Sequence, residues 1–396
     1  MPIWLIALFL TTVAFYTDDY VIAGILPELA EGLNVSEAAA GQLVTVFSLT
    51  IAVATPTAAV LLSGAPRKRL IVSALMMFSA ANVAAMFTDH FAVMVVLRII
   101  AALSAAVATP SIFVAAASLA PPEKRGRYLG FLAIGVTGSI AFGVPLGAWI
   151  GTVFSWHATF LFVAGLGVLA AVWVSVSLPT VAAPPTIAVI EQFRVLRSRS
   201  ISFALAGTGL AIMGSMMLLT YLVPFVNELI GTETSTRTLL FSVTGIAGTA
   251  GVFAGGYATD KLGPNRTIAL GMGVFVVVMC VLSAMWPFRP IPLLMFVPVV
   301  ALWGVLAFWS SPAIQTRMFE VAGDVAAQAM AMNTSVSYLG IAVGGALGGL
   351  VLDNVGPGAL PLVTAVTSIG ALALLMIAFR STSATPERKP AGDPRG

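Results

Sequence analysis

Twelve long apolar runs constrain this chain more than any other feature. Each has about 20 mostly apolar residues, the length that an α-helix needs to cross a bilayer. Charged residues make up only 9% of the 396 residues, against roughly 25% in a typical soluble domain. The sequence therefore predicts an all-α membrane protein with twelve transmembrane helices. The runs are 3–27, 40–63, 69–88, 91–119, 128–151, 157–178, 201–226, 238–259, 267–286, 291–313, 327–350 and 358–379.

The positions of Lys and Arg predict the orientation of these helices. Nearly all of the 19 basic residues follow even-numbered runs or lie in the C-terminal tail. By the positive-inside rule this side faces the cytoplasm, and both termini lie there. The net charge of +3 comes from scattered residues rather than from a basic face, so we expect no nucleic-acid partner. We expect a monomeric, multi-pass membrane protein in a cell membrane of the bacterial inner-membrane type.

Internal spacing indicates that the chain has two related halves. The basic loop that starts at Arg67 recurs at Lys261, and the one at Lys124 recurs at Arg317, at offsets of 194 and 193 residues. Two halves with the same orientation predict parallel repeats around an axis along the membrane normal, and hence two six-helix pseudo-symmetric bundles. The predicted parts are an N-terminal bundle (1–179), a cytoplasmic linker (180–200), a C-terminal bundle (201–380) and a disordered cytoplasmic tail (381–396).

Residues that common enzymes need are missing from this sequence. No Lys is followed by Ser or Thr, so there is no P-loop for nucleotide phosphates. The two histidines, His90 and His157, are too few for a His-rich metal site. Asp18 and Asp19 are adjacent, so they point about 100° apart on one helix, unlike the facing acids of an intramembrane aspartyl protease. We therefore expect no enzymatic activity, no metal and no cofactor.

Three ionisable residues lie deep within predicted spans. Asp18 and Asp19 are near the middle of the first span, and Arg98 is inside the fourth. Each costs about 2.5–3.5 kcal/mol at the bilayer centre, so a functional role is the default hypothesis. In one interpretation an aspartate carries protons in a water-accessible cavity and Arg98 alters its proton affinity. In the other, a fixed Asp–Arg ion pair only joins the two spans. The first is favoured for the aspartates, and the two are balanced for Arg98.

Glycines repeat in the fifth and eleventh spans. Gly143, Gly147 and Gly151 recur every four residues with Pro145 between them, and 340–349 repeats the theme. Small residues at this spacing let helices pack closely, and a proline within a span bends it. The pattern fits simple packing, and it also fits a bend at which the two halves move.

A glycine-rich, charged loop follows the eighth span. It contains Gly256, Asp260, Gly263 and Arg266. Asp260 could accept hydrogen bonds from a neighbouring helix N-terminus and so hold the cytoplasmic side closed. An ordinary charged turn explains the same residues, and spacing alone favours it.

Adaptable side chains within the spans are the candidates for a substrate cavity. Methionine and aromatic residues suit apolar ligands of varied shape, although each is more often a core or lipid-facing residue. The candidates are Tyr20, Met213, Met216, Tyr221, Trp303, Trp309, Asn333 and Tyr338.

Together these motifs resemble the major facilitator superfamily, in its twelve-span drug:proton antiporter branch, over the chain to about residue 380. Residues 17–27 are similar to the first-span signature, in which an acid precedes an aromatic residue. Asp19 matches this acid best, and Asp18 fits a related variant. Arg98 matches the fourth-span arginine associated with proton coupling.

Two further motifs carry the resemblance. Residues 143–147 resemble the fifth-span antiporter signature, and residues 256–266 resemble the loop motif of the superfamily. The first-half copy of that loop, residues 62–69, lacks the acid that the motif normally carries. The resemblance therefore implies that the cytoplasmic contact depends on the second-half copy or is weaker in this chain.

The resemblance implies a secondary transporter with alternating access. It would export small, mostly apolar compounds, such as chloramphenicol-like antibiotics, in exchange for protons as the coupling ion. Alternatives with the same fold are a sugar or metabolite exporter and an uncoupled facilitator, and the scarcity of polar residues in mid-span argues mildly against sugars. A membrane sensor without transport is a further alternative.

Overall fold

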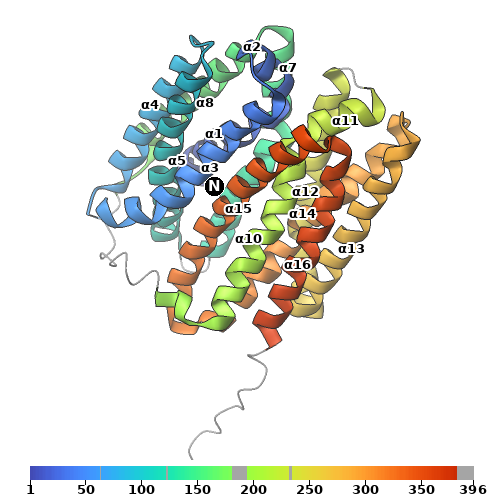
Figure 1. Cartoon of the computed structure of the whole chain (residues 1–396). Helices are drawn as coiled ribbons and strands as arrows, with labels where there is room; N and C mark the ends of the chain where they lie inside the picture. Colours follow the sequence, from blue (N-terminus) through green and yellow to red (C-terminus); the bar gives the residue numbers. More distant parts are fainter. Residues whose placement is uncertain (63, 122–123, 181–193, 232–233, 381–396) are drawn as a thin grey trace, which may run out of the picture.

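The computed structural model is a bundle of long helices. It describes residues 1–62, 64–121, 124–180, 194–231 and 234–380. Twelve helical segments in these ranges are long and apolar enough to cross a membrane, which confirms the predicted number of spans. The first six lie beside the last six, so that the molecule has two halves (Figure 1). Most of the predicted linker and the whole predicted tail lie outside the described residues.

Six long segments form the spans of the first half. The short helix α2 (Leu26–Gly32) follows the first of them, and a π-helical turn divides the fifth. The segments are α1 (Ile3–Gly24), α3 (Glu37–Leu61), α4 (Arg67–Ala85), α5 (Phe91–Leu119), α6–η2–α7 (Arg125–Gly138, Ser139–Gly143, Val144–Val153) and α8 (Trp156–Ser177).

The second half has the same order of elements. The 3₁₀ turn η3 (Arg194–Arg197) leads into its first span, which the short helix α11 (Leu222–Ile230) follows, and short 3₁₀ turns join later helices. The spans are α10 (Arg199–Thr220), α12 (Thr234–Leu262), α13 (Pro264–Met285), α14 (Leu293–Ala322), α15 (Ala326–Asn354) and α16 (Leu360–Arg380). The short turns are η4 (Trp286–Phe288), η5 (Gly323–Val325) and η6 (Pro357–Ala359).

The two ends of the bundle differ in charge. We name the end that carries Arg67, Arg125 and Lys261 the basic end, and the end that carries α2 and α11 the opposite end. Arg317 belongs to the basic end too, but the prediction that it lies in a loop after residue 313 was wrong, because α14 continues to Ala322. The helix tolerates this charge because Arg317 pairs with Glu320 at 2.6 Å and donates to the carbonyl of Phe379 at 2.9 Å.

The first span of each half ends earlier than its apolar run. Helix α1 stops at Gly24 and α10 stops at Thr220, and a short helix with a proline in its first turn follows each of them. Because proline lacks a backbone N–H, it fits the first turn of a new helix better than the interior of an old one. The two breaks are at Ile25 and Tyr221, and they give the halves a matching feature beyond the repeats in sequence.

The predicted bend of the fifth span is a π-helical turn at Ser139–Gly143, two residues before Pro145. The glycines of this span face α1 within the same half. A Cβ atom at Gly143 would meet Thr17, and one at Gly147 would meet Val21. This arrangement matches the packing interpretation for these glycines.

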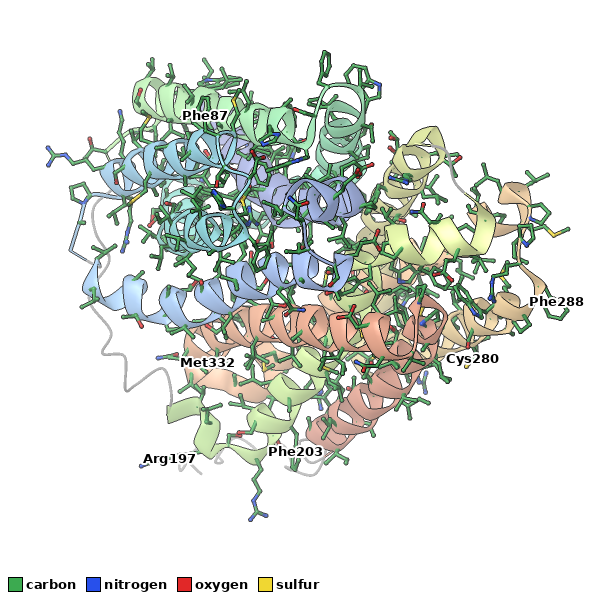
Figure 2. The ribbon with its side chains drawn as sticks, turned by 45° about the horizontal axis from the view of Figure 1, so that its top comes forward. Phe87, Arg197, Phe203, Cys280, Phe288 and Met332 are labelled. Atoms are coloured by element: carbon green, nitrogen blue, oxygen red, sulfur yellow. The ribbon has the colours of Figure 1, made fainter. Side chains whose placement is uncertain are left out.

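The outer surface of the bundle carries large apolar side chains. Phe87 is 76% exposed and Phe288 74% exposed, and Figure 2 shows Phe288 and Phe203 at the edge of the bundle. Lipid is the solvent that such a surface requires, because an exposed apolar area of this extent is unfavourable in water.

Candidate functional site

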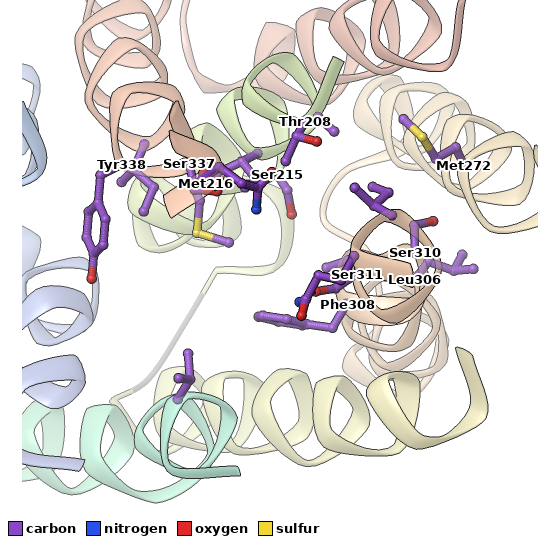
Figure 3. A pocket seen from close by; sticks show the side chains of 18 of the residues that line it. Thr208, Ser215, Met216, Met272, Leu306, Phe308, Ser310, Ser311, Ser337 and Tyr338 are labelled. Carbon is purple, nitrogen blue, oxygen red and sulfur yellow. Dashed lines mark hydrogen bonds between the residues drawn. The ribbon is translucent and has the colours of Figure 1, made fainter. Parts of the chain in front are cut away.

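A cavity of about 320 Å³ lies between the two halves. Its walls come from the middle of the helices and from the parts nearer the basic end, for example residues 306–315 of α14 and 333–341 of α15. Figure 3 shows this space between α10, α14 and α15. The volume is at the lower end of the range of about 300–1,000 Å³ that is usual for small-molecule sites.

The second half supplies all but three of the residues that line this cavity. Tyr16 and Tyr20 of α1 and Val136 of α6 are the contributions of the first half. The others are Thr208, Ala211, Ile212, Ser215, Met216, Met272, Phe275, Leu306, Ala307, Phe308, Ser310, Ser311, Ile314, Gln315, Asn333, Thr334, Ser337, Tyr338, Ile341 and Ser368.

Four of the eight cavity candidates line this space. They are Tyr20, Met216, Asn333 and Tyr338. The other four, Met213, Tyr221, Trp303 and Trp309, are not among the lining residues.

The second group of candidates has other contacts. Trp309 donates its indole N–H to the carbonyl of Thr267 at 3.2 Å, so that it joins α14 to α13. Trp303 is 1% exposed and belongs to the core, as does Tyr221 with no exposure. The backbone carbonyl of Met213 lies close to Gly344 of α15. Apolar residues occur on all faces of α10 and α14. The sequence alone therefore does not indicate which of these faces lines the cavity.

The polar character of the cavity wall was not predicted from the sequence. Nine Ser, Thr, Asn and Gln side chains line the cavity, and all nine come from the second half. The expectation of few polar residues in mid-span is therefore wrong for this half. They are Thr208 and Ser215 on α10, Ser310, Ser311 and Gln315 on α14, Asn333, Thr334 and Ser337 on α15, and Ser368 on α16.

Asp18 and Arg98 form a buried ion pair between α1 and α5. Nη1 of Arg98 lies 2.7 Å from Oδ2 of Asp18, and Nη2 donates to the Asp18 carbonyl at 3.1 Å. The guanidinium also lies over the ring of Phe47 on α3, 4.1 Å from its centroid. Both charged side chains are almost fully buried, at 2% and 0% exposure. Arg98 thus joins three helices of the first half, as the ion-pair interpretation predicts for Asp18.

Asp19 has no such partner. Its side chain is 2% exposed, and neither carboxylate oxygen has a hydrogen bond among the described residues. The hydroxyl of Tyr338 on α15 faces both Asp19 and Tyr16, although it does not reach the geometry of a hydrogen bond to the carboxylate. Figure 3 shows Tyr338 extending from α15 toward the blue helices of the first half. The two adjacent acids therefore differ, because Arg98 neutralises Asp18 and leaves Asp19 without a salt bridge.

The predicted access of an aspartate to water is not present in this conformation. Neither Asp18 nor Asp19 lines the cavity, whereas Tyr16, Tyr20 and Tyr338 do. These three tyrosines come from both halves, and a movement of one half against the other would displace them. Asp19 is thus one side chain away from the cavity and shielded from it.

Contacts between the two halves close the opposite end. Arg237 of α12 and Glu28 of α2 form an ion pair at 2.8 Å. The hydroxyl of Tyr221 lies 3.5 Å from the carbonyl of Ala38 on α3, and it is held there by donating to the carbonyl of Gly345 within the second half at 2.8 Å. The cavity lies between these contacts and the basic end. The two halves therefore meet at the opposite end, and the cavity is between them on the side of the basic end.

Helix α12 approaches the π-helical turn very closely. A Cβ atom at Gly245 would overlap the backbone of Ala141. Only glycine permits this distance between two backbones, so Gly245 marks a contact across which the halves meet directly.

The charged loop at the basic end makes no contact of the predicted closing kind. Asp260 and Arg266 are exposed, and within the described ranges neither takes part in a salt bridge. Gly263 has a φ of 80°, which favours glycine, and it separates α12 from α13. A Cβ atom at Gly256 would meet nothing within 4 Å. The prediction of a loop over residues 256–266 was wrong, because α12 continues to Leu262 and α13 begins at Pro264, so that only Gly263 lies between the two helices.

Among the described residues, no group of three or more His, Cys, Asp or Glu side chains could hold a metal ion. The cavity wall offers hydroxyl and amide groups instead, which bind organic ligands through hydrogen bonds.

Comparison with known proteins shows what this chain is similar to. The family model described as Major Facilitator Superfamily matches residues 8–345. The uncharacterized MFS-type transporter YbcL of Bacillus subtilis is 30% identical over 92% of this chain and 91% of its own length. A chloramphenicol resistance protein of Streptomyces lividans is 30% identical over 89% of this chain and 88% of its own. The crystal structure of a D-xylose–proton symporter has the same fold, with a TM-score of 0.73 at 16% identity over 94% of this chain and 96% of that one.

Proposed function

Because the chain belongs to the major facilitator superfamily, a family of multi-pass membrane transporters, we propose that it exports small molecules in exchange for protons. The cavity between the halves is the cargo site, and Asp19 carries the proton. One observation carries this proposal: Asp19 is buried beside the cavity without a salt bridge, while its neighbour Asp18 is neutralised by Arg98.

The chemistry of a buried carboxylate supports the role of Asp19. An unpaired charge in a dry site is expensive, so a bound proton stabilises the occluded form of Asp19. When cargo enters the cavity and displaces Tyr338, water reaches the carboxyl group and the proton leaves. Asp18 cannot do this as easily, because its carboxylate is already paired with the guanidinium of Arg98. Arg98 in this account fixes the position of α1 through this pair.

The direction of transport follows from the positive-inside rule. If the basic end is cytoplasmic, this conformation is closed to the outside, and its cavity faces the cytoplasm. Cargo binds from that side, and the halves then rock until the contacts of Glu28 with Arg237 and of Tyr221 with the carbonyl of Ala38 separate. Asp19 takes up a proton from outside before the return step.

The proton gradient provides enough free energy for export. One proton that enters gains about 2.3 kcal/mol per 100 mV of membrane potential. It gains about 1.4 kcal/mol more for each unit of pH difference. Expelling a neutral compound against a hundredfold gradient costs about 2.8 kcal/mol, which is less than these two contributions together.

Export of a sugar or another polar metabolite is the second candidate function. The nine Ser, Thr, Asn and Gln side chains of the cavity wall favour it. An uncoupled facilitator of the same fold would leave Asp19 without a role, and so would a sensor that transports nothing.

Transport measurements on purified protein in liposomes test the proposal. Chloramphenicol is the first probe, because a relative of this chain is a chloramphenicol resistance protein. We expect chloramphenicol to drive proton flux in the unmodified protein. Asp19→Asn should abolish this flux but still exchange labelled chloramphenicol across the membrane. The matched control is Asp353→Asn, which changes an exposed acid near the opposite end and should leave the flux unchanged.

Two outcomes would contradict the proposal. One is a proton flux in Asp19→Asn that equals that of the unmodified protein. The other is the same result in the double variant Asp18→Asn/Asp19→Asn, which would exclude both acids as carriers.

A further inference from the structure

Among the described residues, three buried polar atoms without hydrogen-bond partners belong to residues of the cavity wall in the second half. Oγ of Ser215 on α10, Oγ of Ser310 on α14 and Oδ1 of Asn333 on α15 are buried and form no hydrogen bond. Ser215 is 5% exposed and Ser310 is 9% exposed. A buried polar group without a hydrogen bond costs about 1–3 kcal/mol, so native structures contain few of them. Unpaired hydroxyl groups also occur away from the cavity, as at Ser48 and Ser79, but these three belong to residues of a cavity in which a ligand can supply the missing hydrogen bonds.

Most other hydroxyl groups of this wall differ from these three. Thr208 donates to the carbonyl of Ala204 at 2.9 Å, and Ser337 donates to the carbonyl of Asn333 at 2.7 Å. A hydroxyl that donates to its own helix keeps lone pairs that can accept another hydrogen bond. The wall thus offers acceptors at several points and free hydroxyl donors at Ser215 and Ser310.

Apolar side chains form the rest of the cavity wall. Phe308 and Leu306 of α14, Met216 of α10 and Met272 of α13 all line it, and Figure 3 shows them around the space between these helices. Among the described residues that line the cavity, none carries a charge. A ligand that fits this wall has hydrogen-bonding groups beside an apolar or aromatic part, and it has no net charge.

Asp19 does not change this conclusion about charge. Asp19 is 2% exposed and is not part of the wall. In this conformation, before Tyr338 is displaced, a cation that enters the cavity meets no carboxylate in the wall, and burying an unpaired charge is expensive.

We propose that the second half carries the cargo site, and that this site selects uncharged molecules with several hydroxyl, carbonyl or amide groups beside an apolar part, through Ser215, Ser310 and Asn333. This inference rests on the proposed function in taking the cavity as the cargo site. Lipophilic cations have the wrong charge for it. A sugar can form hydrogen bonds with the unpaired polar atoms, but its other hydroxyl groups would then lie against the apolar side chains of Phe308 and the methionines, which is unfavourable.

Equilibrium binding to the purified full-length protein tests the proposal. Three probes differ in the relevant chemistry. Chloramphenicol is uncharged and has hydroxyl and amide groups beside an aromatic ring, tetraphenylphosphonium is a lipophilic cation without hydrogen-bonding groups, and D-xylose is a sugar. We expect chloramphenicol to bind at least tenfold more tightly than either of the others.

Variants assign this selectivity to the named atoms. Ser215→Ala and Asn333→Leu should each weaken chloramphenicol binding about fivefold to tenfold, the value of one hydrogen bond. Ser335→Ala is the matched control, because Ser335 is a buried serine of α15 with an unpaired hydroxyl that does not line the cavity. It should leave binding unchanged. Ser310→Asp adds a negative charge to the wall and should improve tetraphenylphosphonium binding at least tenfold.

The outcomes separate this inference from the proposed function. It is overturned if chloramphenicol does not bind, if tetraphenylphosphonium or D-xylose binds the unmodified protein as tightly, or if Ser215→Ala and Asn333→Leu behave like Ser335→Ala. The Asp19→Asn variant should still bind chloramphenicol. If binding follows these expectations but no proton flux accompanies transport, the proposed function fails and the cargo site remains supported.

Discussion

The buried ion pair of Asp18 and Arg98 makes a quantitative prediction about stability. Asp18→Asn removes the carboxylate and leaves a guanidinium with 1% exposure. Breaking a buried pair by removing one partner costs about 3–5 kcal/mol. Two contacts of Arg98 survive in this variant: the hydrogen bond to the Asp18 carbonyl at 3.1 Å and the ring of Phe47 at 4.1 Å. A cation over an aromatic ring contributes about 2 kcal/mol when both are desolvated, so we expect a loss near the lower limit, about 3 kcal/mol.

A second substitution shows whether the loss comes from an uncompensated charge. Arg98→Met in the Asp18→Asn background removes both charges and fills part of the space. A buried pair can often be replaced by apolar residues at little cost, so the double variant should be within about 1 kcal/mol of the unmodified protein. The assay is unfolding by SDS titration in mild detergent, followed by circular dichroism, as a double-mutant cycle. A single-variant loss below about 1 kcal/mol, or simple additivity of the two substitutions, would refute the burial of this pair.

Two further substitutions test the contact between the halves and the link between cargo and proton. Gly245→Ala places a Cβ atom against the backbone of Ala141 and should disfavour the closed opposite end by about 1–3 kcal/mol. Lower cross-linking of cysteines placed at the Glu28–Arg237 pair would show this, in a background without the native cysteine. Tyr338→Phe removes the hydroxyl that faces Asp19 and should reduce the proton release that accompanies cargo binding, while cargo affinity falls no more than about fivefold.

Each of these two predictions has a matched control. Gly256→Ala is in the same helix as Gly245, but its added atom would meet nothing within 4 Å, so cross-linking should not change. Tyr20→Phe removes another hydroxyl of the cavity wall, and cargo binding should still release its proton. Equal effects of Gly245→Ala and Gly256→Ala, or unchanged proton release in Tyr338→Phe, would contradict the respective prediction.

The number of spans was predictable from the sequence because length and apolar composition alone determine it. The breaks at Ile25 and Tyr221 were not, because both lie inside uninterrupted apolar runs and only the prolines that follow them give a local signal. The extension of α14 past residue 313 was missed for a related reason. Arg317 looks like a loop residue until its contacts with Glu320 and Phe379 are known.

The candidate site was predictable only in part, because its properties depend on which neighbour each side chain faces. Asp18 and Asp19 are adjacent and identical in type, yet only Asp18 meets Arg98. The polar wall was missed because serine and threonine in membrane helices commonly bond to their own backbone, as Thr208 does. Only the coordinates show that Ser215 lacks such a partner.

Proton release on cargo binding tests the central role of Asp19 most directly. Chloramphenicol is added to purified protein in weakly buffered detergent solution, and a pH indicator dye reports the protons that leave the protein. The account predicts that the unmodified protein releases protons as the cavity fills, and that Asp19→Asn binds the same probe and releases none. Release from Asp19→Asn that equals that of the unmodified protein would contradict it, and so would binding to the unmodified protein without any release.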